Sequence, residues 1–472
     1  MTNRISGAAK HQAGSSLRLL GVLLVIVAFI ADGTGALAAP QSLRSDVSLR
    51  KVADSIAAGS TSMRLVRDPS DGALYYLKRG GQIFRLDPAS GASTLVTETA
   101  DHGQSNLQGF AIDPAGTFYL VNNEDVAGTR TRATIVKGVR QPNGTRLWSV
   151  LARSAAYPRS ATAYDHRFNG IIADPNGGFV YVNSGSRTDH GEIQTAGGLY
   201  PNMREAGLTA CILKLPTSGA NIFLRNNREW LRSNGFVFAE GIRNTFDFAF
   251  APNGDLFGTE NGPGRDDPEE LNWLRPGLHY GFPWRMGGND NPQQFADYRP
   301  EDDKLLNPLS HAVKNGYYQN DPTYPPRPGV TLIEPIRNFG PDADKYRDPV
   351  DGLVKDASGR HKRFSTFTAH RSPLGLVFDR AGVLAPEFRG DAFMLSWTKG
   401  SPTGDNIAGP FKDASQDLLH LDLTKSGGTY TLHATRIVAD FNKPIDAEII
   451  GNTVYVLEYG GIQSIWAVSL PQ

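Results

Sequence analysis

An all-β fold, arranged as a six-bladed β-propeller, is the fold class that this sequence predicts. Three observations carry the prediction: 51 glycines and 30 prolines among 472 residues, one turn-and-strand pattern that occurs six times, and hardly any sustained helical periodicity. Long loops are expected on one face of such a propeller. A β-sandwich is the competing fold, but a sandwich of this length needs two domains, and no linker-like change in composition separates two halves.

The repeated pattern is a glycine-containing turn followed by a short aromatic and β-branched run, which is typical of a hairpin that enters a strand. Its copies occupy residues 71–76, 115–120, 176–181, 253–257, 389–393 and 450–455. Because a propeller repeats one hairpin-based unit around its axis, we expect each copy to mark one blade.

The N-terminal segment differs in composition from the rest. Three basic residues precede an apolar run at 19–30, and small residues at 36–38 suit a signal peptidase. The sequence therefore predicts a cleaved signal peptide at 1–38 and one propeller domain at 39–472, in the periplasm or secreted. A retained anchor is the alternative, but the apolar run falls short of the roughly 20 residues that span a bilayer. We expect no stable membrane span after cleavage.

Charge excludes one class of partner. Lysine plus arginine and aspartate plus glutamate both number 48, and no long basic run supplies a local positive field. Nucleic acid is therefore not expected as a partner.

One long segment, residues 285–330, interrupts the repeats with a high content of Asn, Asp, Pro and Tyr. A loop of this length is typically functional or disordered. We expect it to be an excursion over one face of the propeller, and we place no catalytic residue on it.

Two dipeptides just before repeated strands carry possible chemistry. Asp165-His166 precedes the apolar run at 171–175, and a histidine with a pKa near 6.5 is a natural acceptor for a hydroxyl proton. Arg243-Asn244 follows a glycine, and a fixed guanidinium there suits an anionic group or a developing oxyanion. The alternatives are a structural histidine and a salt bridge between blades.

Gly262-Pro263 is the candidate metal-binding turn. Its carbonyl oxygens lie near a carboxylate-rich stretch at 266–272, and hard oxygen ligands suit calcium, whereas no His-Cys set with metal-like spacing occurs. The alternative is a solvated acidic turn. Asp189, His190 and Glu192 are predicted to be ordinary loop residues.

An ordered series of motifs runs from Gly241 to Pro283, at residues 241–244, 260–263, 270–272 and 279–283. The chain resembles the soluble glucose/sorbosone dehydrogenase family, whose members are six-bladed propellers that use pyrroloquinoline quinone (PQQ) with Ca²⁺. Residues 369–376 and 387–391 resemble the sorbosone branch most closely.

The resemblance implies a dehydrogenase that oxidises a hydroxyl of a sugar or related polyol or aldose by hydride transfer to PQQ. It implies that His166 is the general base, oriented by Asp165, and that Gln104 contacts the sugar substrate. Electrons would leave to an external acceptor.

The resemblance also implies the cofactor ligands. Arg243 would stabilise charge on the quinone oxygen, and Gly262 and Pro263 would hold calcium through their carbonyl groups. Asn244, Lys399 and Lys443 would complete the PQQ contacts.

One position departs from the family pattern. Where two arginines are expected near the last repeat, residues 442–446 supply only Lys443 as a basic side chain. A calcium-dependent lactonase-like hydrolase and a non-catalytic carbohydrate-binding propeller therefore stay open as alternatives to the dehydrogenase.

Overall fold

Six mainly antiparallel sheets dominate the structure, which confirms the prediction of an all-β, six-bladed propeller. The structure is a computed structural model that describes residues 39–358 and 364–472, and these lie within one compact unit ending at Gln472. The predicted signal peptide at 1–38 lies outside the described residues.

The first three blades follow one another along the chain. Blade 1 contains β3 (Ser62–Arg67), β4 (Leu74–Lys78), β5 (Ile83–Leu86) and β6 (Ser93–Thr97). Blade 2 contains β7 (Leu107–Ile112), β8 (Phe118–Val126), β9 (Arg130–Arg140), β10 (Arg146–Ser154), β11 (Tyr157–Pro158) and β15 (Ile222–Leu224). Blade 3 contains β12 (Phe168–Ala173), β13 (Phe179–Ser184), β14 (Cys211–Pro216), β16 (Val237–Glu240) and β20 (Leu278–His279).

The last three blades use both ends of the described chain. Blade 4 contains β17 (Thr245–Phe250), β18 (Leu256–Glu260) and β19 (Glu270–Leu274). Blade 5 contains β27 (Pro373–Phe378), β28 (Ala392–Ser396), β29 (Leu418–Ser426), β30 (Thr429–Ala439), β23 (Arg337–Asn338), β26 (Phe364–Ser365) and β1 (Gln41–Ser42). Blade 6 contains β31 (Pro444–Ile450), β32 (Thr453–Glu458), β33 (Ser464–Ser469) and β2 (Ser48–Asp54).

The loops contain short strands and helices. The strands β21 (Arg285–Met286) and β22 (Asn289–Asp290) pair with each other, as do β24 (Lys345–Arg347) and β25 (Val354–Asp356). The helices are α1 (Thr99–His102), α2 (Arg228–Ser233), α3 (His311–Lys314) and the 3-10 turns η1 (Ile56–Ala58), η2 (Pro292–Gln294) and η3 (Pro300–Asp302). None of the helices within 39–358 and 364–472 has the length and apolar content to cross a membrane.

The six predicted repeats are the turns that connect the first strand of each blade to the second. They lead into β4, β8, β13, β18, β28 and β32. In each turn a glycine takes a left-handed backbone conformation, with φ between 59° at Gly451 and 86° at Gly254. Glycine adopts this conformation without a steric penalty, which explains why the turns could be located in the sequence.

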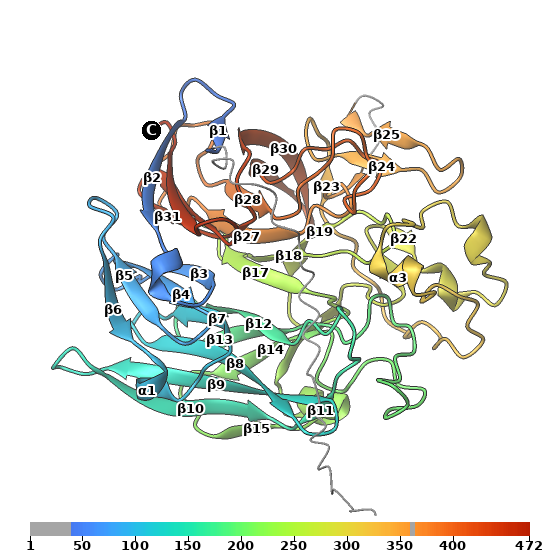
Figure 1. The fold of residues 1–472 in the computed structure, drawn as a ribbon, viewed down its shortest axis with the longest axis horizontal. Helices are drawn as coiled ribbons and strands as arrows, with labels where there is room; N and C mark the ends of the chain where they lie inside the picture. Colours follow the sequence, from blue (N-terminus) through green and yellow to red (C-terminus); the bar gives the residue numbers. More distant parts are fainter. Residues whose placement is uncertain (1–38, 359–363) are drawn as a thin grey trace, which may run out of the picture. The chain divides into compact units, whose positions relative to one another are not determined.

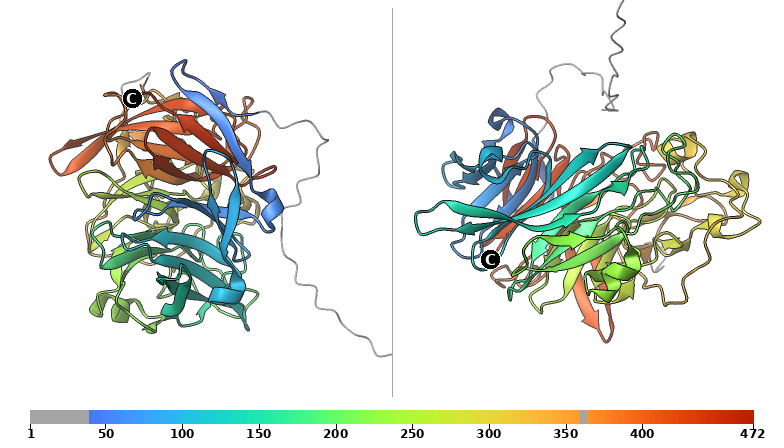
Figure 2. Two further views of the ribbon diagram at one scale, coloured as in Figure 1. Left: turned by 90° about the vertical axis from the view of Figure 1, so that its left-hand side faces the viewer. Right: turned by 90° about the horizontal axis from the view of Figure 1, so that it is seen from below.

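The first strands of the blades form a closed ring around the axis. Each of β3, β7, β12, β17, β27 and β31 packs against the next, and β31 packs against β3. The ring closes because β2 pairs with β33, so that blade 6 combines residues from both ends of the described chain. Figure 1 and the left view of Figure 2 show the blue β2 at the edge of the red C-terminal strands, of which β33 is its partner.

The hydrophobic core is divided among the six interfaces between neighbouring blades. Successive side chains of a strand point to opposite faces, so each strand contributes to two interfaces. On β4, Tyr75 packs between blades 1 and 2, whereas Tyr76 packs between blades 1 and 6. On β27, Val377 and Phe378 divide in the same way between blades 6 and 4. Strands buried on both faces read as nearly continuous apolar runs.

Polar side chains satisfy the backbone on the inner edge of the ring. The backbone N–H groups of Leu65 and Arg67 on β3 donate to Asp446 Oδ2 (2.8 Å) and Glu448 Oε2 (2.9 Å) on β31. The N–H of Leu376 on β27 donates in the same way to Asp247 Oδ2 at 2.8 Å. These carboxyl groups therefore tie neighbouring blades together.

Arg64 makes the longest connection across the axis. From β3, its guanidinium donates to the carbonyl of Gln108 (3.0 Å) just inside β7 and to the carbonyl of Phe246 (2.9 Å) on β17. The group also lies over the Phe246 ring at 4.0 Å and 3.7 Å from Asp247 Oδ1. The buried arginine thus joins three of the six blades.

Asp446 provides a test of this inner ring. Asp446→Ala leaves the Leu65 N–H without its acceptor, and a buried unsatisfied donor costs about 1–3 kcal/mol. Burial and the neighbouring Asp247 raise the pKa of Asp446 well above its usual range, so Asp446→Asn preserves both shape and charge. We expect urea unfolding to show the largest loss for Asp446→Ala and a smaller loss for Asp446→Asn, whose single amide oxygen cannot accept from the N–H groups of both Leu65 and Ala447. Exposed Asp422→Ala is the control, and equal stability of Asp446→Ala and the parent would contradict this role.

Candidate active site

The predicted site residues gather where the inner strands begin. His166 lies two residues before β12, Arg243-Asn244 comes directly before β17, and Lys443 comes directly before β31. Because the inner strands of a propeller run in the same direction, these positions face one end of the axis. The end defined by His166, Arg243 and Lys443 is called the site end below.

A backbone link brings His166 and Arg243 together. The N–H of His166 donates to the carbonyl of Ser186 (3.1 Å), and the N–H of Ser186 donates to the carbonyl of Arg243 (2.6 Å). Gly185 permits this approach, because a Cβ at that position would lie 2.5 Å from the Cβ of His166 and 3.2 Å from Asn244 Oδ1. Two residues far apart in the sequence are thereby placed in one site.

The hydrogen bonds of His166 define which ring nitrogen is available. Ser186 Oγ donates to the carbonyl of Thr188 at 2.8 Å, so its proton is used, and it accepts from His166 Nδ1 at 3.0 Å. His166 Nδ1 therefore carries the proton, and Nε2 keeps its lone pair. Within the described residues Nε2 has no hydrogen-bond partner. Desolvation, followed by the charge of Arg243, lowers the pKa of His166 to about 3, so the ring is neutral at pH 7.

Ser186, rather than Asp165, positions the histidine ring. The carboxylate of Asp165 accepts from the N–H groups of Ser160 (2.7 Å) and Ala161 (3.0 Å) and so holds the preceding loop. The expectation that Asp165 orients His166 is thus wrong. The sequence could not reveal this, because Ser186 belongs to a different segment from the histidine.

Arg243 is held rigidly and keeps part of its donor capacity. Its Nε and Nη2 donate to the backbone carbonyl (2.7 Å) and Oδ1 (2.9 Å) of Asp189, and Nη1 donates to the carbonyl of Asn261 (3.0 Å). A guanidinium has five N–H groups, so about two of them remain for a ligand. The planar fork suits a bidentate oxygen acceptor.

Asp189, His190 and Glu192 are not ordinary loop residues, and that prediction is wrong. All three are buried, and Asp189 forms the ion pair with Arg243. His190 Nδ1 lies 2.9 Å from Asp189 Oδ2. The Asp189–His190 pair thus holds the guanidinium of Arg243 in place.

The segment 285–330 covers this pair. His190 Nε2 lies 2.9 Å from Gln293 Oε1, and the ring of Tyr318 stacks on His190 with centroids 3.8 Å apart. Figure 1 shows the segment, marked by β22 and α3, on one side of the blades. An excursion whose sequence shows no regular pattern therefore shields the arginine and its partners from solvent.

Glu260 shapes the turn that presents Arg243 and Asn244. Its carboxylate accepts from the backbone N–H groups of both residues, at 2.9 Å for Asn244, and from Thr245 Oγ1 at 2.7 Å. Burial raises its pKa to about 7. Asn244 Oδ1 in turn accepts from Asn169 Nδ2 at 2.7 Å, so its amide oxygen is already engaged.

The donor set around Gly262 and Pro263 fits a calcium ion. Neither carbonyl oxygen accepts a hydrogen bond from the residues that the structure describes. Glu269 lies beside Gly262, with its Cγ 3.4 Å from a Cβ built there, and its buried Oε2 has no partner. Three hard oxygens without hydrogen bonds are the ligands that calcium prefers. No group of three or more His, Cys, Asp or Glu side chains within the described ranges is arranged to hold a metal.

The remaining predicted residues lie further from this cluster. Lys399 is exposed, and its backbone bridges to Ser415. Lys443 is half-buried, with Nζ 5.9 Å from the centre of the Trp397 ring. Gln104 lines a polar cavity of about 430 Å³ at the site-end edge of blade 2, beside Asp125. Within the described residues, Gln104 and Lys399 form no hydrogen bond with His166 or Arg243.

Fold and site together define a six-bladed propeller with a polar centre at the starts of its inner strands. The sequence model described as "Glucose / Sorbosone dehydrogenase" matches residues 60–312. This match covers more than half of the chain, and the chain belongs to that family.

Several known proteins are similar to this chain. Quinoprotein glucose dehydrogenase B of Acinetobacter calcoaceticus is 25% identical over 305 residues, which are 58% of this chain and 61% of that protein. The matched part therefore spans less than two thirds of that relative.

Two solved structures share the fold. The apo form of the soluble aldose sugar dehydrogenase of Escherichia coli gives a TM-score of 0.55 at 14% identity, over 90% of this chain and 100% of that one. The holo form of the pyranose dehydrogenase PQQ domain of Coprinopsis cinerea gives 0.54 at 13% identity, over 93% and 100%.

Buried glutamates predict how stability depends on pH. Burial raises the pKa of Glu260 to about 7 and that of Glu270 to about 8, from about 4.5 in the unfolded chain. A raised folded pKa contributes stability that is complete below pH 4.5 and is lost as pH rises through the folded value. We expect the melting temperature of the metal-free protein to fall between pH 6.5 and pH 8.5.

The variant Glu270→Gln removes one of these titrating groups. We expect its melting temperature to fall less steeply with pH than that of the parent protein. His166 and His279 act in the opposite sense, because their lowered pKa values of about 3 and about 4 remove stability as pH falls below 6.5. Differential scanning fluorimetry across this range is the measurement. A melting temperature that rises steadily to pH 8.5 would contradict the assignment.

Proposed function

We propose that the protein is a PQQ- and calcium-dependent dehydrogenase that oxidises a hydroxyl of a sugar or related polyol. The observation that carries the proposal is the pairing of a neutral histidine, whose Nε2 is free, with a buried arginine across the Gly185-Ser186 link. Membership of the glucose/sorbosone dehydrogenase family supports it. Two similar proteins, a quinoprotein glucose dehydrogenase and a pyranose dehydrogenase PQQ domain, support PQQ as the cofactor.

In this mechanism His166 Nε2 takes the proton of the substrate hydroxyl. Ser186 keeps the other nitrogen protonated and the ring fixed, which aligns the lone pair with the reacting group. Desolvation, followed by the charge of Arg243, lowers the pKa of His166, so the base is unprotonated over the whole neutral range. The free N–H groups of Arg243 would bind an oxygen that gains negative charge.

The quinone, when bound, supplies a two-electron acceptor for the hydride of the sugar carbon. Arg243, Asn244, Lys399 and Lys443 would hold it through charge and hydrogen bonds. Gly262, Pro263 and Glu269 would hold calcium, and Gln104 and Asp165 would contact the sugar from the neighbouring blade edge. The predicted signal peptide supports action in the periplasm or outside the cell, with electrons passing to an external acceptor.

Reconstitution tests the proposal directly. The purified protein is mixed with Ca²⁺ and PQQ, and quinone binding is measured together with sugar-dependent dye reduction. His166→Ala is expected to lower turnover by about 10²–10⁴-fold, because it removes the general base, while quinone binding is retained. Asp422→Ala is the matched control and should keep full turnover. Absence of PQQ binding at micromolar concentration, or lactone hydrolysis without quinone, would refute the dehydrogenase.

Calcium binding has its own test that does not depend on turnover. Ca²⁺ at 1 mM is expected to raise the melting temperature of the parent protein, because a ligand that binds only the folded state stabilises it. Glu269→Gln removes the charge of the carboxyl group whose Oε2 has no hydrogen-bond partner, and it should abolish most of that rise. Glu301→Gln, an exposed glutamate on the 285–330 segment, is the control. An unchanged calcium response in Glu269→Gln would exclude Glu269 as a ligand.

A further inference from the structure

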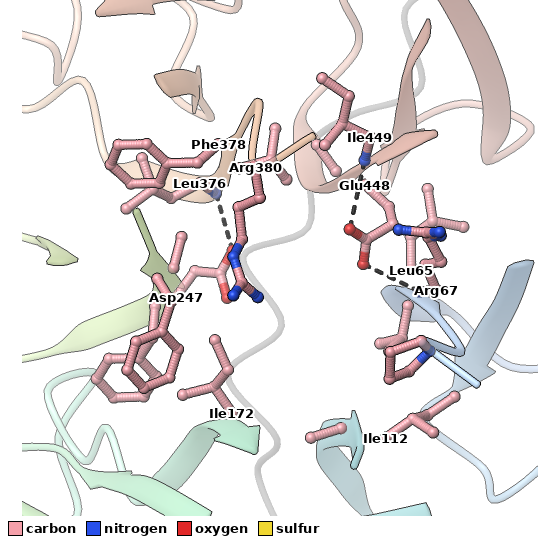
Figure 3. A pocket seen from close by; sticks show the side chains of 18 of the residues that line it. Leu65, Arg67, Ile112, Ile172, Asp247, Leu376, Phe378, Arg380, Glu448 and Ile449 are labelled. Carbon is pink, nitrogen blue, oxygen red and sulfur yellow. Dashed lines mark hydrogen bonds between the residues drawn. The ribbon is translucent and has the colours of Figure 1, made fainter. Parts of the chain in front are cut away.

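A second cavity opens at the end of the axis opposite to the site end. It has a volume of about 430 Å³ and is lined by the later residues of all six inner strands. His166, Arg243 and Lys443 precede those strands, so they do not line it. We call it the far-end cavity. Figure 3 shows it with Arg380 and Asp247 on one side and with Arg67 and Glu448 on the other.

The two ends of the axis are separated by side chains. Arg64 is the first residue of β3 to line the far-end cavity, and its guanidinium reaches carbonyl groups on β7 and β17. A ligand in the far-end cavity therefore does not enter through the site end. The cavity is a site of its own, with its own opening.

Much of the cavity wall is apolar. Ile112, Ile172, Leu376, Phe378 and Ile449 project from four of the six blades and surround the space in Figure 3. A volume in this range is typical of small-molecule sites, which combine apolar walls with few polar groups. The wall thus suits a compact aromatic or branched aliphatic body.

The carboxyl groups of the cavity are already committed to the backbone. Asp446 accepts from the N–H groups of Leu65 (2.8 Å) and Ala447 (3.0 Å), and Glu448 accepts from Arg67 N (2.9 Å) and Ile449 N (3.3 Å). Burial raises the pKa of Asp446 well above its usual range and that of Glu448 to about 7. Asp446 is therefore neutral at pH 7, Glu448 is about half ionised, and the oxygens of both groups already accept from backbone N–H groups.

Asp247 is committed in the same way. Its Oδ2 accepts from Leu376 N, and its Oδ1 faces Arg64 at 3.7 Å. Burial raises its pKa as well. None of the three carboxyl groups is free to bind a cation.

The guanidinium groups of Arg67 and Arg380 are the uncommitted charges. Both side chains are exposed, and within the described residues neither guanidinium forms a hydrogen bond or a close ion pair, although the charge of Arg67 acts on the Glu448 carboxyl. Each offers a planar fork that matches a carboxylate. Two guanidinium groups beside apolar side chains favour a ligand that is anionic at one end and apolar at the other.

We propose that the far-end cavity binds a small organic monocarboxylate with an aromatic or branched aliphatic body. The carboxylate pairs with Arg380 and Arg67 at the mouth, and the apolar body lies against the wall formed by Ile112, Ile172 and Phe378. This site is independent of the redox centre proposed above.

The probe for the test is 2-naphthoate, and its uncharged partner is 2-naphthalenemethanol, which has the same ring system. Binding to the full-length chain is measured by isothermal titration calorimetry. We expect naphthoate to bind, and Arg380→Gln and Arg67→Gln each to weaken binding about tenfold or more, because hydrogen bonds to charged groups are strong. Arg299→Gln, an exposed arginine on the 285–330 segment, is the matched control and should bind as the parent does.

Three results would overturn the proposal. The first is equal affinity for the naphthoate and the alcohol, since the charge would then be irrelevant. The second is unchanged binding in both arginine variants while their melting temperatures match the parent. The third is displacement of naphthoate by PQQ in the presence of Ca²⁺, which would place the probe at the site end.

Discussion

The unpaired inner edge of the strand ring is the constraint on which the rest of the structure depends. Each inner strand has a partner on one side only, so its other edge presents backbone N–H and C=O groups to the axis. Buried groups of this kind need partners. Asp446, Glu448 and Asp247 supply acceptors from a neighbouring blade, and Arg64 supplies donors across the axis. The fold itself therefore requires polar side chains along the axis, apart from any role in function.

The same device builds the candidate site. Glu260 accepts the backbone N–H groups of Arg243 and Asn244 much as Asp446 accepts that of Leu65. The buried Glu260 carboxylate therefore holds the turn before β17. The side chain of Arg243 is not needed to hold this turn. The site end differs in having two polar atoms, His166 Nε2 and Glu269 Oε2, that find no hydrogen-bond partner among the described residues. The far end instead leaves two guanidinium groups.

Features encoded in local sequence were predictable. The six turns were found because each needs a glycine with a left-handed φ, followed by strand-forming residues. Local sequence also indicated Arg243, which stands in the ordered series of motifs, and His166, which precedes a repeated apolar run. Asp189, His190 and Ser186 were missed or misjudged because their importance depends on contacts between segments far apart in the chain. Gln293 and Tyr318 could not be predicted either, because they contact His190 from a distant segment. That segment also has no periodic pattern.

The pairing of β2 with β33 has a kinetic consequence. In an open array of repeats, each unit can form as soon as it and its neighbour exist. Here the ring cannot close until Ser464–Ser469 meets Ser48–Asp54, which is a contact between residues about as distant in the chain as the fold allows. Contacts of such high order slow folding and make it more cooperative. Without that contact blade 6 lacks its outermost strand, so the completion of this blade depends on both ends of the described chain.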